Sequence, residues 1–218
     1  MSYYPLVPAI IPADLPALLA YAKTLTFAKE IQLDLVDGRF VESVSWPYDP
    51  VGEPMSVSAA LAPYTLEVDL MVTEPLAVAS EWIKAGADML VFHVETLSLE
   101  SFIQFAAHTT VSIGVSAHGA TSLDTLSAYA AQADYIQLMG IYEIGAQGLP
   151  FDEAVLDKTR ELKKRFPNMM ISVDGSVNEH TITRLRDAGV DRFISGSAIV
   201  LQPDPEAAFK RLSALIND

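Results

Sequence analysis

The chain has 218 residues, half of them hydrophobic, which is enough apolar material for one large buried core. It contains no cysteine, which excludes disulfides, thiolate metal sites and a cysteine nucleophile and suits a reducing compartment such as the cytoplasm. The formal net charge of −14, without any stripe of Lys and Arg, argues against a nucleic-acid partner, and the short, charge-broken apolar runs argue against a membrane.

Short β-prone runs alternate with longer helical patterns along the whole chain. In chain order, each predicted strand and the helix after it are 6–11 and 14–28, 31–38 and 55–61, 65–71 and 75–85, 89–94 and a helix from Ser98, 111–115 and 122–131, 135–139 and 152–165, 170–174 and 178–188, and 192–195 and 205–216. The strands are almost continuously apolar, as in a parallel sheet that is buried on both faces. Eight such units predict an α/β fold, a single (β/α)8 TIM barrel over residues 1–218.

Working residues of such a barrel lie at the carboxyl ends of its strands and in the loops that follow. The polar residues at the predicted strand ends are Gln32, Asp34, Asp69, His93, Glu95 and Asp174, and His118 in a later loop could also line the site. Gln32 and Asp34 are two residues apart, so they point to the same face of their strand. Two polar side chains on so apolar a strand need partners or a function, because unpaired burial is costly.

Small residues follow the seventh and eighth predicted strands. They form the runs Asp174-Gly175-Ser176-Val177 and Ser195-Gly196-Ser197-Ala198. Such loops let the backbone approach an anion closely, so that N–H groups and helix N-termini can hold a phosphate. In so acidic a protein, an anionic ligand would need backbone donors of this kind or a metal ion.

Taken together, these motifs resemble the ribulose-phosphate 3-epimerase family over essentially the whole chain. The matching runs are PAIIPAD (8–14), DLVDGRFV (34–41), DLMV (69–72), AGAD (85–88), FHVE (92–95), GAQ (145–147), VDGSV (173–177), AGVD (188–191) and SGSA (195–198). Each run is weak alone, but their order and spacing are specific for ribulose-phosphate-binding barrels and point to the epimerases among them.

The resemblance implies an isomerase of carbohydrate metabolism that inverts carbon 3 of D-ribulose 5-phosphate to give D-xylulose 5-phosphate. Two aspartates transfer protons on opposite faces of the sugar, and they match Asp34 and Asp174; a divalent metal assists them. The implied substrate-binding residues are the methionines near the reacting carbon, the covering loop and the phosphate cradle, namely Met71, Met139, Gly145, Ala146, Gln147, Gly175, Ser176, Gly196 and Ser197. No organic cofactor is implied, and a homo-oligomer is expected.

Gln32 and Asp69 stand where the family's metal-binding histidines are expected. The implied ligand set is therefore Gln32, Asp34, Asp69 and Asp174, whose all-oxygen chemistry favours Mn²⁺ or Mg²⁺ over Zn²⁺. Three converging carboxylates repel one another, so the sequence leaves open whether a metal or a shared proton relieves them.

Two alternative functions remain open at this point. Loss of both histidines would also suit a non-catalytic sugar-phosphate-binding barrel. A related aldolase or decarboxylase, such as hexulose-phosphate synthase, would need an Asp-x-Lys-x-x-Asp run at the third strand, and residues 69–74 read DLMVTE, without a lysine.

Overall fold

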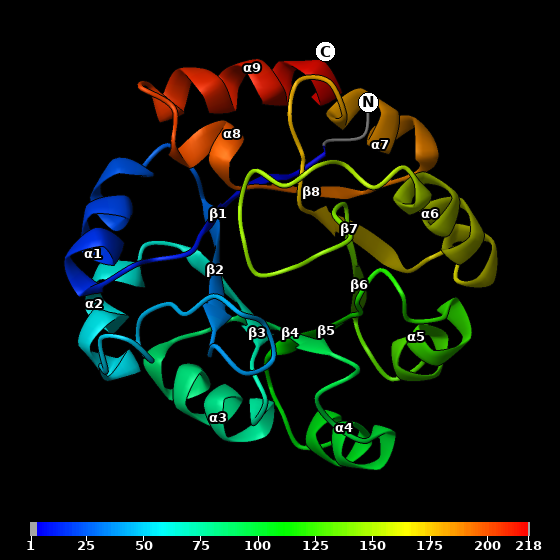
Figure 1. Ribbon diagram of the computed structural model, residues 1–218, viewed down its shortest axis with the longest axis horizontal. Coiled ribbons are helices and arrows are strands. Elements are labelled where there is room, and N and C mark those ends of the chain that lie inside the picture. The colour runs from blue at the N-terminus through cyan, green and yellow to red at the C-terminus, as the bar shows by residue number, and fades with distance from the viewer. Residues whose placement is uncertain (1–3, 218) are drawn as a thin grey trace.

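Apolar runs of four to seven residues form parallel strands in this protein, and the strands pair in a closed ring. The computed structural model describes residues 4–217, and within them eight parallel strands form a closed barrel whose first strand pairs with the last (Figure 1). The strands are β1 (Leu6–Ile10), β2 (Glu30–Val36), β3 (Thr65–Met71), β4 (Met89–His93), β5 (Ser112–Ser116), β6 (Tyr135–Met139), β7 (Met170–Asp174) and β8 (Arg192–Ser195). The predicted (β/α)8 barrel is confirmed.

Helices surround the barrel, and the main core lies between them and the outer face of the strands. They are α1 (Leu15–Thr24), the 3₁₀ turn η1 (Pro54–Val57) with α2 (Ser58–Leu61), α3 (Pro75–Ala85), α4 (Leu99–Ala106), α5 (Leu123–Ala130), α6 (Ala154–Arg165), α7 (Ile182–Ala188), α8 (Ser197–Val200) and α9 (Pro205–Asn217). Within residues 4–217, no helix combines the length and the apolar character that crossing a membrane requires.

Side-chain caps define where several helices begin. Asp14, Ser98 and Ser122 each accept a hydrogen bond from the backbone N–H three residues later, which satisfies a donor that the first helical turn leaves free. α3 and α7 end at Gly86 and Gly189, both in the left-handed conformation that glycine adopts without steric cost.

Several helices differ from the predictions, and the helix predicted over 55–61 is the 3₁₀ turn η1 followed by α2. The helix predicted to start at residue 178 begins only at Ile182, because Asn178 and Thr181 hydrogen-bond to each other in a turn. The helix predicted to reach residue 28 ends at Thr24, whose hydroxyl bonds back to the carbonyl of Ala20. The short helix α8 was not predicted, because its residues read as a loop of small side chains.

Register places the polar strand ends at one level of the barrel. Asp34 of β2 is paired with Asp69 of β3, and Met139 of β6 is paired with Asp174 of β7. Since parallel strands present their carboxyl ends on the same side, the loops after all eight strands meet at this end. The functional candidates from distant parts of the sequence are therefore brought together by the strand pairing itself.

A buried ion pair fills the opposite, amino-terminal end of the barrel. Arg192 donates to Glu67 over 2.7 Å and to the partly exposed Glu30 over 3.2 Å, while the hydroxyl of Tyr135 donates to the other oxygen of Glu67 over 2.6 Å. The positive charge of Arg192 is therefore already paired with the carboxylates of Glu67 and Glu30. Arg192 does not neutralise the aspartates at the carboxyl end of the barrel, whose negative charge needs another counterion or bound protons.

Candidate active site

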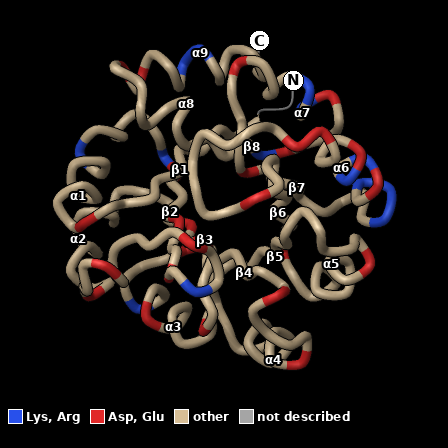
Figure 2. The backbone as a smooth tube through the Cα atoms, viewed as in Figure 1, with Lys and Arg blue, Asp and Glu red and all other residues tan. Residues whose placement is uncertain are grey.

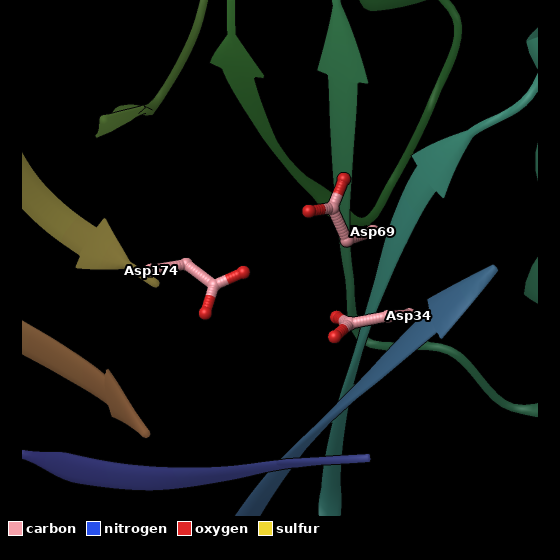
Figure 3. A group of neighbouring side chains, drawn as sticks. All are labelled: Asp34, Asp69 and Asp174. Atoms are coloured by element: carbon pink, nitrogen blue, oxygen red, sulfur yellow. The ribbon is translucent and has the colours of Figure 1, made fainter. Parts of the chain in front are cut away.

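Three aspartates converge at the carboxyl end of the barrel. Asp34 comes from β2, Asp69 from β3 and Asp174 from the end of β7, and Figure 3 shows their carboxylates turned toward a common space. One oxygen of each lies within 4.8 Å of the others, and none of the three residues is more than 8 % exposed. In Figure 2 the acidic segments of the paired strands β2 and β3 lie next to each other in the barrel wall.

Gln32 connects Asp34 and Asp174, the two aspartates to which the family resemblance assigns proton transfer. Its amide nitrogen donates to Asp34 Oδ1 over 2.8 Å and to Asp174 Oδ2 over 3.2 Å. Its carbonyl oxygen is buried without a hydrogen-bond partner among residues 4–217. In this orientation Gln32 is a donor, and only a turn of the amide would offer its oxygen to an ion, so its role as a metal ligand stays a prediction.

Asp69 is held by two side chains from other strands. His93 Nε2 on β4 lies 3.0 Å from Asp69 Oδ1, and the amide nitrogen of Gln137 on β6 donates to Asp69 Oδ2 over 2.9 Å. The strand-end pattern had drawn attention to His93 but not to Gln137. Gln137 stands two residues before Met139 on the same face of its strand, and the same period of two could have identified it.

The predicted substrate-binding residues surround one pocket above the aspartates. The pocket is lined by Asp34 and Asp174 and by all nine of the residues Met71, Met139, Gly145, Ala146, Gln147, Gly175, Ser176, Gly196 and Ser197. Gln32 and Asp69 do not line it, since both are fully buried. The structure thus brings the predicted set together, with Ile11, Ile141 and Asn178 among the further lining residues.

The loops after β7 and β8 shape the far end of this pocket. Gly175 and Ser176 have φ values of 97° and 51°, so the chain turns sharply where these two residues line the cavity. Gly196 lies against the covering loop, because a Cβ there would come within 2.4 Å of the amide nitrogen of Gln147. Gln147 in turn donates to the carbonyl of Ala9 over 3.1 Å, which fastens the covering loop to β1.

His118 lies near the site without lining the pocket. Its ring packs 4.9 Å from that of Phe40, and Phe40 packs 5.3 Å from the ring of His93. The rings of His118 and His93 also lie 6.4 Å apart, so His118 is linked to Asp69 through His93.

The crowded carboxylates hold protons more tightly than ordinary ones. Burial, and after it the charges of Asp174 and Asp69, raises the pKa of Asp34 well above its usual value. Burial and the charge of Asp69 raise the pKa of Asp174 to about 7, although the hydrogen bond from Gln32 opposes both shifts. Because the two carboxyl groups interact strongly, their apparent pKa values describe the pair rather than either residue alone.

This pKa shift predicts how the stability of the metal-free protein depends on pH. The native aspartates keep protons that an unfolded chain releases above about pH 4, so between about pH 4 and 7 the native state binds more protons. In EDTA, we therefore expect the free energy of unfolding from urea titrations to fall as the pH rises from 5 to 8. Asp174→Asn should flatten this decline, and a parallel decline in wild type and variant would contradict the assignment.

The same cluster can hold a divalent metal ion. Three carboxylates offer hard oxygen ligands at short mutual distance, and within residues 4–217 neither Lys nor Arg forms an ion pair with any of them. The unpartnered oxygen of Gln32 is a further oxygen ligand within reach of a turn of its amide. The residues present therefore fit a divalent cation, whose charge would relieve the repulsion that otherwise requires protons.

Sequence comparison identifies relatives along almost the whole chain. The model of the ribulose-phosphate 3 epimerase family matches residues 6–200. A ribulose-phosphate 3-epimerase of Bacillus subtilis is 32 % identical over 216 residues, covering 94 % of this chain and 96 % of the relative. One from Mycobacterium leprae is 29 % identical over 214 residues, covering 95 % and 92 %.

Solved structures extend the comparison to the fold. A 3-hexulose-6-phosphate synthase superimposes with a TM-score of 0.72 at 20 % identity and covers 97 % of this chain and 99 % of its own. A structure titled KGPDC from Streptococcus mutans, in complex with D-R5P, gives a TM-score of 0.74 at 15 % identity, with coverage of 97 % and 96 %. At such identities the likeness is one of fold alone.

Proposed function

Because the chain belongs to the ribulose-phosphate 3-epimerase family and is thus an epimerase of sugar phosphates, we propose that it interconverts D-ribulose 5-phosphate and D-xylulose 5-phosphate. The observation that carries this substrate is the position of Asp34 and Asp174 on β2 and β7, which line one pocket together with the small-residue loops. Two buried acids at one end of a pocket and a phosphate cradle at the other suit a ketose phosphate.

Asp34 and Asp174 are the acid–base pair of this reaction. One carboxylate removes the proton from carbon 3, and the other, in its acid form, returns a proton to the opposite face of the resulting enediolate. The raised pKa values of Asp34 and Asp174 suit this role, since a buried carboxyl that holds its proton toward neutral pH can act as an acid. Gln32, which donates to both carboxylates, keeps the base and the acid at a fixed separation.

Asp34, Asp69 and Asp174 would hold the divalent metal, for which Mn²⁺ or Mg²⁺ suits the oxygen ligands better than Zn²⁺. When bound, the ion supplies positive charge that stabilises the enediolate. The protein contributes the apolar side chains of Met71, Met139 and Ile141, which line the pocket and exclude water from the reacting carbon.

The phosphate is held by the backbone of Gly175, Ser176, Gly196 and Ser197. Among the lining residues that the structure describes there is no Lys or Arg, so N–H groups carry the recognition of the anion. Residues 145–147 cover the substrate, since Gln147 already lies over Gly196. We further propose that the enzyme works in the cytoplasm as a homo-oligomer, without a nucleic-acid or membrane partner.

Proton exchange tests this function directly. The pure protein, treated with EDTA and then supplied with Mn²⁺, Mg²⁺ or Zn²⁺ in turn, is incubated with D-ribulose 5-phosphate in D₂O, and the proton at carbon 3 is followed by NMR. We expect deuterium to enter at carbon 3 and D-xylulose 5-phosphate to accumulate, with no exchange of unphosphorylated D-ribulose. If deuterium enters under none of these conditions, the proposed substrate is wrong.

A further inference from the structure

Asp69 differs from the other two aspartates in that both of its oxygens are engaged by side chains that lie outside the substrate pocket. We propose that His93 and Gln137 are positioning residues that orient the Asp69 carboxylate as the third ligand of the divalent-metal site. The proposal rests on the metal site described above. It assigns a role to two residues that do not line the substrate pocket and that, within residues 4–217, form no hydrogen bond with the other two aspartates.

The hydrogen bonds fix the carboxylate without using up its ligand capacity. His93 Nε2 meets Oδ1 at 3.0 Å and Gln137 Nε2 meets Oδ2 at 2.9 Å, so both ends of the carboxylate plane are held. Each carboxylate oxygen has two lone-pair sites, and one at each oxygen stays available for an ion. A carboxylate that binds a metal ion only accepts hydrogen bonds, so the proposed role requires the tautomer in which His93 Nε2 is the donor.

The two positioning residues leave the negative charge of Asp69 available to a cation. Gln137 is a neutral amide, and a neutral imidazole is sufficient for the single hydrogen bond from His93. An arginine or lysine in either place would instead neutralise the carboxylate and weaken its attraction for a cation. Metal sites commonly orient their ligands through such neutral hydrogen bonds, and loss of one typically weakens metal binding by about 10–100-fold.

His93 and Gln137 are enclosed by the protein together with Asp69. The side chains of Asp69, His93 and Gln137 are fully buried, and the His93 ring packs against Phe40, whose ring also contacts His118. Within residues 4–217, His93 Nδ1 and the carbonyl oxygen of Gln137 have no hydrogen-bond partner. In the part of the chain that the structure describes, Asp69 is therefore the only side chain to which the side chain of either His93 or Gln137 is hydrogen-bonded.

Metal titration without substrate tests the proposal. His93→Leu and Gln137→Met remove one donor each at similar volume, His93→Gln keeps an amide donor at the same distance from the backbone, and His108→Leu alters an exposed histidine as a control. The dissociation constant for Mn²⁺ is measured by calorimetry on EDTA-treated, dialysed protein, and the melting temperature is measured in EDTA. Only variants with a cooperative melting transition are compared.

We expect Mn²⁺ to bind about 10–100-fold more weakly to His93→Leu and Gln137→Met. His93→Gln should bind Mn²⁺ to within about threefold of wild type, and His108→Leu should bind it as wild type does. Across the variants, the Mn²⁺ dissociation constant should not follow the melting temperature measured in EDTA. Should one leucine or methionine variant fail to fold, the other decides.

Equal Mn²⁺ affinity in wild type and the folded donor-lacking variants would overturn the proposal. So would a loss of affinity in His93→Gln as large as that in His93→Leu, because the amide donor would then have no effect. A wild-type protein that incorporates deuterium at carbon 3 but binds no Mn²⁺ would overturn this proposal and leave the epimerase function standing. If the wild-type protein binds Mn²⁺, with the losses expected for the variants, but shows no deuterium exchange, the positioning proposal stands and the epimerase function on this substrate is wrong.

Discussion

Asp174→Asn is expected to lower the rate of deuterium entry at carbon 3 by about 10²–10⁴-fold, the usual contribution of one acid–base group. The amide keeps the shape of the carboxylate but can neither take a proton from the substrate nor give one. Asp174 lies beside the Gly175–Ser176 turn rather than in the proposed phosphate cradle itself, so affinity for inorganic phosphate should change by less than about threefold. The two readouts are NMR exchange in D₂O and calorimetric phosphate titration.

Asp187→Asn is the matched control, because Asp187 is an exposed aspartate on α7, the helix that follows β7. It should exchange deuterium at the wild-type rate. Asp34→Asn should be as impaired as Asp174→Asn if the two act as a pair across the substrate. An Asp174→Asn enzyme that retains exchange within about fivefold of wild type would show that another group is the acid or base on that face.

The barrel could be predicted because each strand is a local pattern. Eight apolar runs between helical segments permit few other folds, and parallel strands always bring their carboxyl ends to one side. Asp34 and Asp174 could therefore be placed together although 140 residues separate them in the sequence. Helix ends were less predictable, as at residue 178, where an asparagine–threonine turn takes the place of the first helical turn.

The contacts around Asp69 could not be predicted in the same way. Gln137 is a single polar residue in an otherwise apolar strand, and its contact with Asp69 depends on how β3 and β6 face each other across the closed barrel. The orientation of the Gln32 amide is similarly a property of the assembled site. The family resemblance implied that Gln32 and Asp69 replace two histidines, but the hydrogen bonds of His93 and Gln137 to Asp69 became visible only when the strands were in place.

Those donors explain how an aspartate can occupy a position where the family resemblance leads one to expect an imidazole. Asp69 brings a third negative charge into the cluster, and fully buried carboxylates require hydrogen bonds as well as countercharge. His93 and Gln137 supply the hydrogen bonds, while Gln32 bonds to the other two aspartates. The countercharge is what a divalent ion or bound protons must provide.

Gln32→His combined with Asp69→His should therefore change the metal preference of the site. Two imidazole nitrogens favour Zn²⁺, and the loss of one carboxylate weakens the attraction for Mn²⁺ and Mg²⁺. We expect the ratio of Zn²⁺ to Mn²⁺ affinity, measured by competition with a chromophoric chelator, to rise by about 10²-fold or more. Gln32→Met, which removes the amide without adding an imidazole, is the control and should not raise Zn²⁺ affinity. If the double variant keeps the wild-type Zn²⁺ to Mn²⁺ ratio, Gln32 and Asp69 do not lie in the coordination sphere of the ion, and the metal site must be sought elsewhere on the barrel.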